Sequence, residues 1–167
     1  MKIKPKTVAF IGVGTALAMI LAYLETLIPP LIPAIPGIKM GLPNIIIVFL
    51  LYRKGPLFAS LVSLLRIILV SILFGNLMGF FYSLAGGVLS MLVMILLRKI
   101  KLFSTVGVSV AGAVMHNVGQ VLVAMLLLET PQLMYYLVVL TITGTIAGIL
   151  IGLCGAMLIK RVPNKII

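Results

Sequence analysis

The chain has no aspartate, one histidine, one cysteine and two glutamates, Glu25 and Glu129, which stand far apart. Protein metal sites are built from carboxylates or from clusters of cysteine and histidine, so this composition argues against an internal metal site. It also argues against catalysis by a pair of carboxylates. A phosphate-binding loop of the GxxxxGK(S/T) type is absent, so the chain is not expected to hydrolyse nucleotides on its own. We therefore predict no catalytic residue and no cofactor.

Charged residues of any kind are scarce. They make up 9% of the chain, against 63% hydrophobic residues and a mean hydropathy of +1.37. Soluble proteins are roughly half apolar, so this composition is typical of an integral membrane protein. Membrane spans would use most of the 167 residues and leave only short connections, and we predict a single integral membrane domain over residues 1–167.

The few basic residues are grouped. Eleven of the thirteen lysines and arginines fall into four clusters, at residues 2–6, 53–54, 98–101 and 160–165. The positive-inside rule places such clusters on the cytoplasmic side, so we predict that both termini are cytoplasmic and that the number of spans is even. Because the clusters lie in the loops of one face, they favour contact with anionic membrane lipids over binding of nucleic acid.

We predict an all-α membrane protein with six transmembrane helices, over residues 7–28, 41–52, 56–74, 78–97, 106–128 and 133–159. The first run is too long for the core of a signal peptide, so we interpret it as a span. The second would reach only about 18 Å as a helix, short of a hydrocarbon core of about 30 Å. Its outer end is therefore expected below the membrane surface, with the proline-rich region 29–44 plugging or roofing a cavity and residues 29–40 acting as its gate.

Seven of the polar side chains inside these spans stand out as candidates for function, because a polar group there is costly unless it is paired. They are Glu25, Asn44, Arg66, Tyr82, His116, Asn117 and Gln120, and two more, Lys39 and Asn76, are expected at the outer rim. We predict that these nine residues bind a substrate in a pocket that opens outward.

Alternatives remain open for these polar residues. The last three of the seven share one stripe of a helix and could simply hold neighbouring helices together by hydrogen bonds. A cation at the depth of Arg66 needs a partner. Either Glu25 pairs with it, or Arg66, Lys39 and His116 leave a positive potential for an anionic ligand. We expect a mixture of the two arrangements.

Small residues recur every four positions in the first and last spans, which lets helices approach closely. Packing within the bundle is expected for the ladder of the last span, Gly144, Gly148, Gly152 and Ala156. In the fourth span, Gly86 and Gly87 leave room for either a ligand or a neighbouring backbone.

Several segments together resemble one bacterial family. They are LETLIPPLIPAIPGIKMGLPN (24–44), LLR (64–66), FGN (74–76), SLAGG (83–87) and GVSVAGAVMHNVGQ (107–120). Over nearly the whole chain this set resembles heptaprenyl diphosphate synthase component I, a family also labelled the Gx transporter family. Its six-span architecture is similar to that of the S components of energy-coupling factor transporters, which capture vitamins for a separate ATPase module. The resemblance implies an S-component-like bundle with a short second helix in the bacterial cytoplasmic membrane.

The two family labels imply different functions. Prenyl elongation uses aspartate-rich segments, which this chain lacks, so the first label implies at most a membrane accessory to a separate, soluble prenyl diphosphate synthase. The likeness to S components implies capture of a small anionic or amphiphilic metabolite, a vitamin or an isoprenoid or quinone precursor, from outside. It also implies that the ladder of the first span, Gly14, Ala18 and Ala22, contacts a transmembrane coupling subunit that works with a pair of ATPases. Capture of a metabolite is our leading hypothesis, and the accessory role is the alternative.

Overall fold

The computed structural model describes residues 5–27 and 41–163, and this part of the chain is helical with no strand. Its elements are α1 (Pro5–Leu27), α2 (Asn44–Arg53), α3 (Pro56–Leu73), α4 (Leu77–Ile100), α5 (Thr105–Leu127), the short 3-10 helix η1 (Pro131–Tyr135) and α6 (Tyr136–Arg161). Their bounds differ from the predicted spans by only a few residues, so the all-α class is confirmed.

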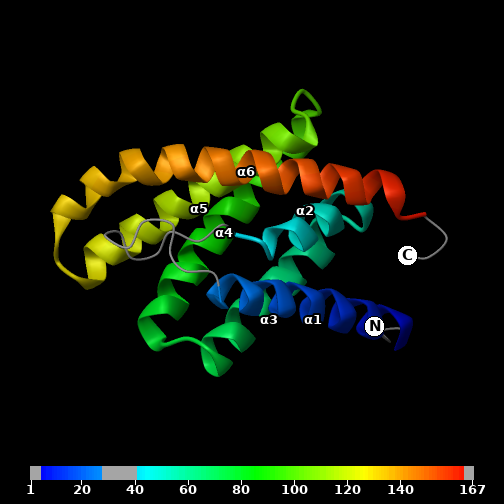
Figure 1. Cartoon of the computed structure of the whole chain (residues 1–167), viewed down its shortest axis with the longest axis horizontal. Coiled ribbons are helices and arrows are strands. Elements are labelled where there is room, and N and C mark those ends of the chain that lie inside the picture. Colours follow the sequence, from blue (N-terminus) through cyan, green and yellow to red (C-terminus); the bar gives the residue numbers. More distant parts are fainter. Residues whose placement is uncertain (1–4, 28–40, 164–167) are drawn as a thin grey trace.

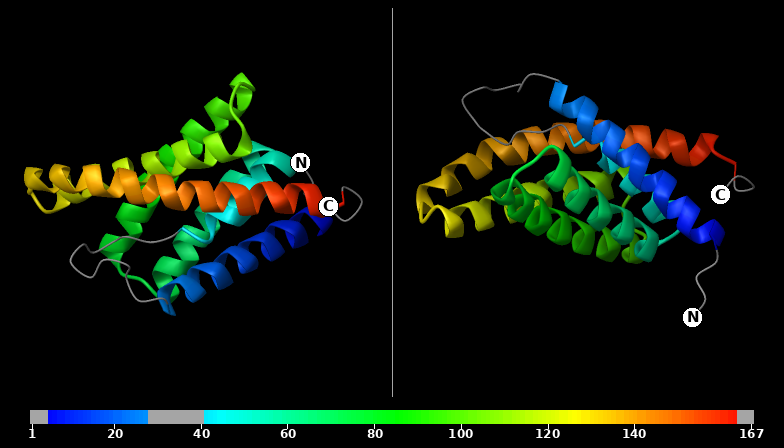
Figure 2. Two further views of the ribbon diagram at one scale, coloured as in Figure 1. Left: turned by 45° about the horizontal axis from the view of Figure 1, so that its top comes forward. Right: turned by 90° about the horizontal axis from the view of Figure 1, so that it is seen from below.

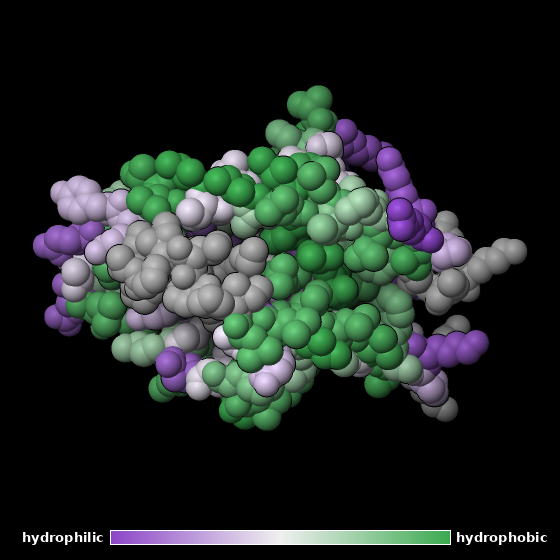
Figure 3. Space-filling view, in the orientation of Figure 1, coloured by the Kyte–Doolittle hydropathy of each residue, from purple (hydrophilic) through white to green (hydrophobic). Residues whose placement is uncertain are grey.

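The long helices have the length and composition of membrane spans. Five helical stretches, with η1 and α6 counted as one, are long and apolar enough to cross a bilayer. Hydrophobic side chains form a continuous area at the centre and right of centre of the face in Figure 3, and hydrophilic side chains gather mainly toward its ends. The chain is therefore a multi-pass membrane protein. The side of the membrane on which the termini lie remains a prediction.

Local sequence signals explain several helix ends. Asn76 caps the start of α4, where its side-chain oxygen accepts a hydrogen bond from the Gly79 N–H at 2.7 Å. Ser104 caps α5 in the same way, with 3.1 Å to the Gly107 N–H. Helix α3 starts with a proline directly after Gly55, whose φ of 98° suits glycine.

The helices follow one another around the bundle. Helix α1 packs on α3, α3 on α4, α4 on α5 and α5 on α6, while α2 contacts α1, α3 and α6. Figures 1 and 2 show the Pro5 end of α1 and the Arg161 end of α6 at the same end of the molecule. This arrangement fits the prediction that both termini lie on one side of the membrane.

Contacts of the basic residues bring their clusters to that same end. The ammonium group of Lys54 lies 5.0 Å from the centre of the Phe10 ring, and the guanidinium of Arg98 lies 5.5 Å from that of Tyr52. Arg53 donates hydrogen bonds to the carbonyl oxygens of Ile159 and Val162 at the end of α6. The contacts thus tie α2 to the first, fourth and last helices at one end of the bundle.

Helix α2 is the short element on which the site depends. Its ten residues span about 15 Å, half of a hydrocarbon core of about 30 Å. Ile47, Val48, Leu50 and Leu51 are all but completely buried in the central core. Helix α2 thus fills the space between α1 and α6 near the end with the basic residues, and its N-terminus stops within the bundle.

Glycines set the closest helix crossings. A Cβ on Gly119 of α5 would lie 2.8 Å from the Gly86 Cα of α4, and a Cβ on Gly148 of α6 would lie 2.7 Å from the Val110 Cα of α5. The prediction that the ladder of the last span packs inside the bundle is confirmed for its glycines. A neighbouring backbone, and not a ligand, fills the space beside Gly86.

The ladder in α1 requires a correction. Gly14, Ala18 and Ala22 are buried within this chain. A Cβ on Gly14 would meet Leu50 of α2 and Val62 of α3, each at 3.4 Å. Because packing inside the bundle already covers these three residues, they do not form the expected contact surface for a coupling subunit. The exposed face of α1 instead carries large apolar side chains such as Val13 and Ile20.

Candidate functional site

Six of the nine predicted site residues line one small cavity. Its volume is about 90 Å³, and the six are Glu25, Asn44, Arg66, His116, Asn117 and Gln120. They come from α1, the N-terminus of α2, α3 and α5, and residues of α4 and α6 complete the wall. The cavity adjoins the N-terminus of α2, since Gly41, Pro43 and Asn44 belong to its wall. We call it the polar cavity.

Arg66 is the cation of the polar cavity. It belongs to the middle of α3, and its Nη2 donates to Asn44 Oδ1 at 3.5 Å, at the long limit for a hydrogen bond. Its Nε is buried and has no hydrogen-bond partner within the part of the chain that the structure describes. Glu25 is near enough for its charge to attract that of Arg66. The electrostatic attraction offsets part of the cost of a buried cation, yet donor capacity remains on the guanidinium.

Glu25 also fixes the chain where it enters α2. Its Oε1 accepts a hydrogen bond from the Gly41 N–H. Gly41 has a φ of 75°, which glycine adopts readily and other residues rarely do. A Cβ there would lie 3.1 Å from the Asn44 side-chain nitrogen. Glu25 therefore joins α1 to the start of α2 beside Arg66. The expected mixture of pairing and open positive potential remains a prediction.

Asn117 serves at least partly as a link between helices. Its Nδ2 donates to the Leu140 carbonyl oxygen of α6 at 2.6 Å. A Cβ on Gly144 would lie 2.5 Å from this same nitrogen, so only glycine leaves the amide its place. The interhelical role that the sequence left open is thus present for Asn117. Its side chain still contributes to the wall of the polar cavity.

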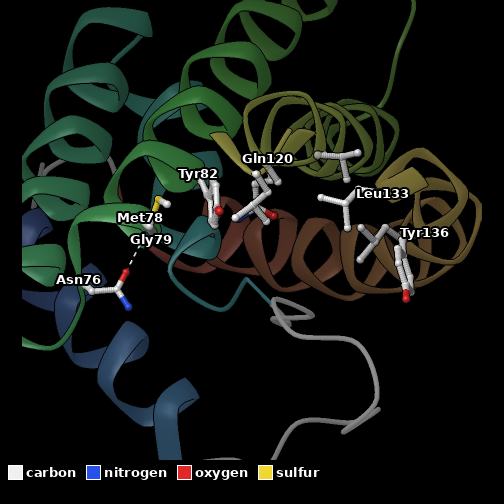
Figure 4. Close-up of a pocket in the computed structure, with 11 residues that line it drawn as sticks. Asn76, Met78, Gly79, Tyr82, Gln120, Leu133 and Tyr136 are labelled. Atoms are coloured by element: carbon white, nitrogen blue, oxygen red, sulfur yellow. Dashed lines mark hydrogen bonds between the residues drawn. The ribbon is translucent and has the colours of Figure 1, made fainter. Parts of the chain in front are cut away.

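A second cavity lies between α4, α5, η1 and α6. Its volume is about 420 Å³, and Figure 4 shows Tyr82, Gln120, Leu133 and Tyr136 around it, with Asn76 at one end. Most of the remaining wall is hydrocarbon, from Met78, Val121, Ala124, Leu128 and Leu140. We call it the apolar cavity. Gln120 lines both cavities.

The predicted set therefore divides between two cavities. Tyr82 and Asn76 line the apolar cavity and not the polar one. The Asn76 oxygen is engaged as the cap of α4, which is a structural role that the sequence analysis did not assign. Lys39 and the expected gate, residues 29–40, lie outside the described residues. Substrate binding by any of the nine remains a prediction.

Some wall residues were not foreseen. Thr26, Ser71 and Ser83 place hydroxyl-bearing side chains in the wall of the polar cavity. Thr26 and Ser83 each follow a residue that was predicted, so sequence neighbours could have drawn attention to them. Serine and threonine are common in membrane helices because they bond to their own backbone, as Thr26 does to the Tyr23 carbonyl oxygen at 2.6 Å. Their presence alone therefore gave no signal.

The polar cavity contains groups that can bind oxygen atoms of a ligand. Among the described residues no group of three or more histidines, cysteines, aspartates or glutamates lies close enough together to hold a metal ion. What the cavity offers is a guanidinium and amide groups, which recognise carboxylate, phosphate or carbonyl oxygens.

A comparison with protein families agrees with the resemblance seen in the sequence. The model of the family described as heptaprenyl diphosphate synthase component I matches residues 15–158. This range covers α2 to α5, η1 and most of α1 and α6, and therefore both cavities. No curated protein and no solved structure shows significant similarity to the chain.

Proposed function

We propose that this chain, which belongs to the heptaprenyl diphosphate synthase component I family, is the substrate-binding membrane subunit of an importer of the energy-coupling factor type. Its role there resembles that of an S component. It captures a small anionic or amphiphilic metabolite from outside and holds it in the polar cavity. A separate coupling subunit and its ATPase pair supply the energy. The chain itself is a single membrane domain of the bacterial cytoplasmic membrane and catalyses no reaction.

The observation that carries this proposal is the state of Arg66. A charged residue at the centre of a membrane helix costs about 2.5–3.5 kcal/mol or more, so it is retained where it serves a purpose. Glu25 attracts it, but its buried Nε has no hydrogen-bond partner among the described residues and its bond to Asn44 is long. An anionic oxygen in the cavity would supply the missing acceptor.

The surrounding wall supports capture of a ligand over a purely structural ion pair. Asn44, Gln120 and His116 contribute further polar groups to the same space. A closed structural pair would need no cavity between six helices. The short α2 creates this cavity, because its N-terminus stops inside the bundle beside Arg66.

Native mass spectrometry of the full chain, released from lipid nanodiscs, tests the proposal. We expect a bound small molecule on the wild type and its loss on Arg66→Gln, with part of the occupancy restored by Arg66→Lys, which keeps the charge but not the planar fork. The matched control is Lys101→Gln, because Lys101 is a cation in the loop after α4. This variant should keep the bound small molecule. Equal occupancy on wild type and Arg66→Gln would refute the proposal.

The family description favours a second candidate, a non-catalytic accessory subunit of heptaprenyl diphosphate synthase. In that role the chain would hold a soluble, aspartate-rich synthase at the membrane through its cytoplasmic loops. It predicts that the synthase copurifies with the chain and that the polar cavity carries no metabolite. The same mass spectra therefore separate the two candidates.

A further inference from the structure

The polar and apolar cavities are neighbours that share a wall residue. Gln120 of α5 borders both, and Tyr82 of the apolar cavity precedes Ser83 of the polar one on α4. Asn117 lines the polar cavity, and its amide is bonded to the carbonyl of Leu140, which lines the apolar one. A ligand that passes Gln120 would therefore lie in both spaces.

The sizes of the two spaces restrict what could lie there. At about 30 Å³ for each water-sized group, the apolar cavity of about 420 Å³ holds roughly 14 carbon atoms of a chain. By the same measure the polar cavity of about 90 Å³ holds roughly three such groups. That is room for one carboxylate or one phosphate, and it is too small for a fused ring system.

The chemistry of the walls agrees with this division. The polar cavity supplies the Arg66 guanidinium, whose geometry matches the oxygens of a carboxylate or phosphate. Ala124, Val121 and Leu133 of the apolar cavity offer only hydrocarbon. Hydrocarbon walls favour an apolar occupant, since a polar one would find few hydrogen-bond partners there.

We propose that the ligand is an amphiphile with a single small anionic head and one hydrocarbon chain of up to about 14 carbons. The head binds at Arg66, and the chain passes Gln120 into the apolar cavity. This inference rests on the proposed function, because it takes the polar cavity as the binding site. It narrows the substrate class to single-chain carboxylates or phosphates and excludes large polar vitamins.

The test uses the full chain in lipid nanodiscs and two series of probes, n-alkyl phosphates and n-alkyl carboxylates from 2 to about 18 carbons, the upper length chosen to exceed the capacity of the cavity. Dissociation constants are measured for wild type, Ala124→Phe and Leu122→Phe. Ala124 lines the apolar cavity, whereas Leu122 is 51% exposed on the same helix and makes the matched control. The ratio of variant to wild type at each chain length removes partitioning into lipid, which is the same for both proteins.

We expect Ala124→Phe to change the binding of the two-carbon probe by less than about twofold and to weaken the twelve-carbon probe about tenfold or more, since each methylene kept from water contributes up to about fourfold. Leu122→Phe should change neither. Ala124→Leu adds less bulk and should weaken binding of the twelve-carbon probe by an intermediate factor. The placement of the chain can therefore still be tested if the Phe variant fails to fold. The series with the tighter short-chain binding identifies the head as phosphate or carboxylate.

Two results separate the possible failures. Equal weakening of short and long probes by Ala124→Phe, or wild-type affinity that does not depend on chain length, would overturn the placement of the chain and leave Arg66-dependent capture intact. No binding in either series would overturn this inference alone, because the mass spectra still test whether the cavity holds another metabolite. Binding that Arg66→Gln leaves unchanged would overturn Arg66-dependent capture and this inference with it.

Discussion

Gly119→Ala tests whether the contact between α4 and α5 is as close as the structure indicates. The added Cβ would lie 2.8 Å from both the Ala85 carbonyl oxygen and the Gly86 Cα. Carbon atoms pack best at about 3.5–4.0 Å, so the helices would have to separate locally by about 0.7 Å or more. The atoms in the way are backbone, which cannot rotate aside as a side chain would.

The expected magnitude follows from two opposing terms. Overpacking of this kind typically costs about 1–3 kcal/mol, while replacing glycine by alanine within a helix recovers up to about 1 kcal/mol. We expect a net loss of about 1–2 kcal/mol for Gly119→Ala. Gly12→Ala is the control, because a Cβ on this exposed glycine of α1 would meet nothing within 4 Å, and it should be neutral or stabilising by up to about 1 kcal/mol.

Reactivity of the only cysteine, Cys154 in α6, can report unfolding as SDS is added to protein in bicelles. The two variants should differ by about 1–3 kcal/mol, which is on the order of 5- to 150-fold in the unfolding equilibrium. If Gly119→Ala proved as stable as Gly12→Ala, the close crossing of α4 and α5 would be wrong.

Three further predictions concern other parts of the bundle. Arg53→Ala should lower the free energy of unfolding by about 1.5–3 kcal/mol, because the carbonyl groups of Ile159 and Val162 at the end of α6 lose a charged donor. Lys160→Ala should change this free energy little, and the SDS titration measures both variants. Asn76→Ala should cost about 1 kcal/mol through loss of the α4 cap, and Asn76→Asp should retain stability in the same titration. With the native cysteine replaced by serine, an impermeant maleimide should label Thr130→Cys in intact cells and Phe103→Cys only after permeabilisation, and the reverse pattern would contradict the predicted orientation.

The sequence was sufficient to predict the helices and most of the polar side chains that line the polar cavity. Long apolar runs broken by proline, glycine or basic clusters define membrane helices almost by themselves. Because a polar residue in hydrocarbon must face the bundle interior, Glu25, Arg66 and Gln120 could be expected to converge without knowledge of the packing.

Other features depend on which helices pack against each other, and a residue pattern along one helix does not show this. The ladders of α1 and α6 look alike in sequence, and a pattern of small residues says that something approaches closely but not what. The structure shows that α2 and α3 lie against Gly14, whereas the backbone of α5 lies against Gly148. The apolar cavity was also missed, although Asn76, Tyr82 and Gln120 were named, because most of its wall is ordinary hydrophobic residues and only the arrangement of four elements leaves the space open.

The attachment of α2 to α6 has a consequence for the order in which the protein assembles. Arg53 reaches the carbonyl of Ile159, 106 positions later, and a Cβ on Gly155 would lie 3.0 Å from Val48. During synthesis from the N-terminus, α2 is therefore made long before its partner leaves the ribosome. Docking of this short helix, and with it completion of the polar cavity, must await the last helix. A nascent chain that stops before α6 would hold the five helices α1 to α5 and no finished site, because Gly144, Ala147 and Ile151 of α6 belong to the cavity wall.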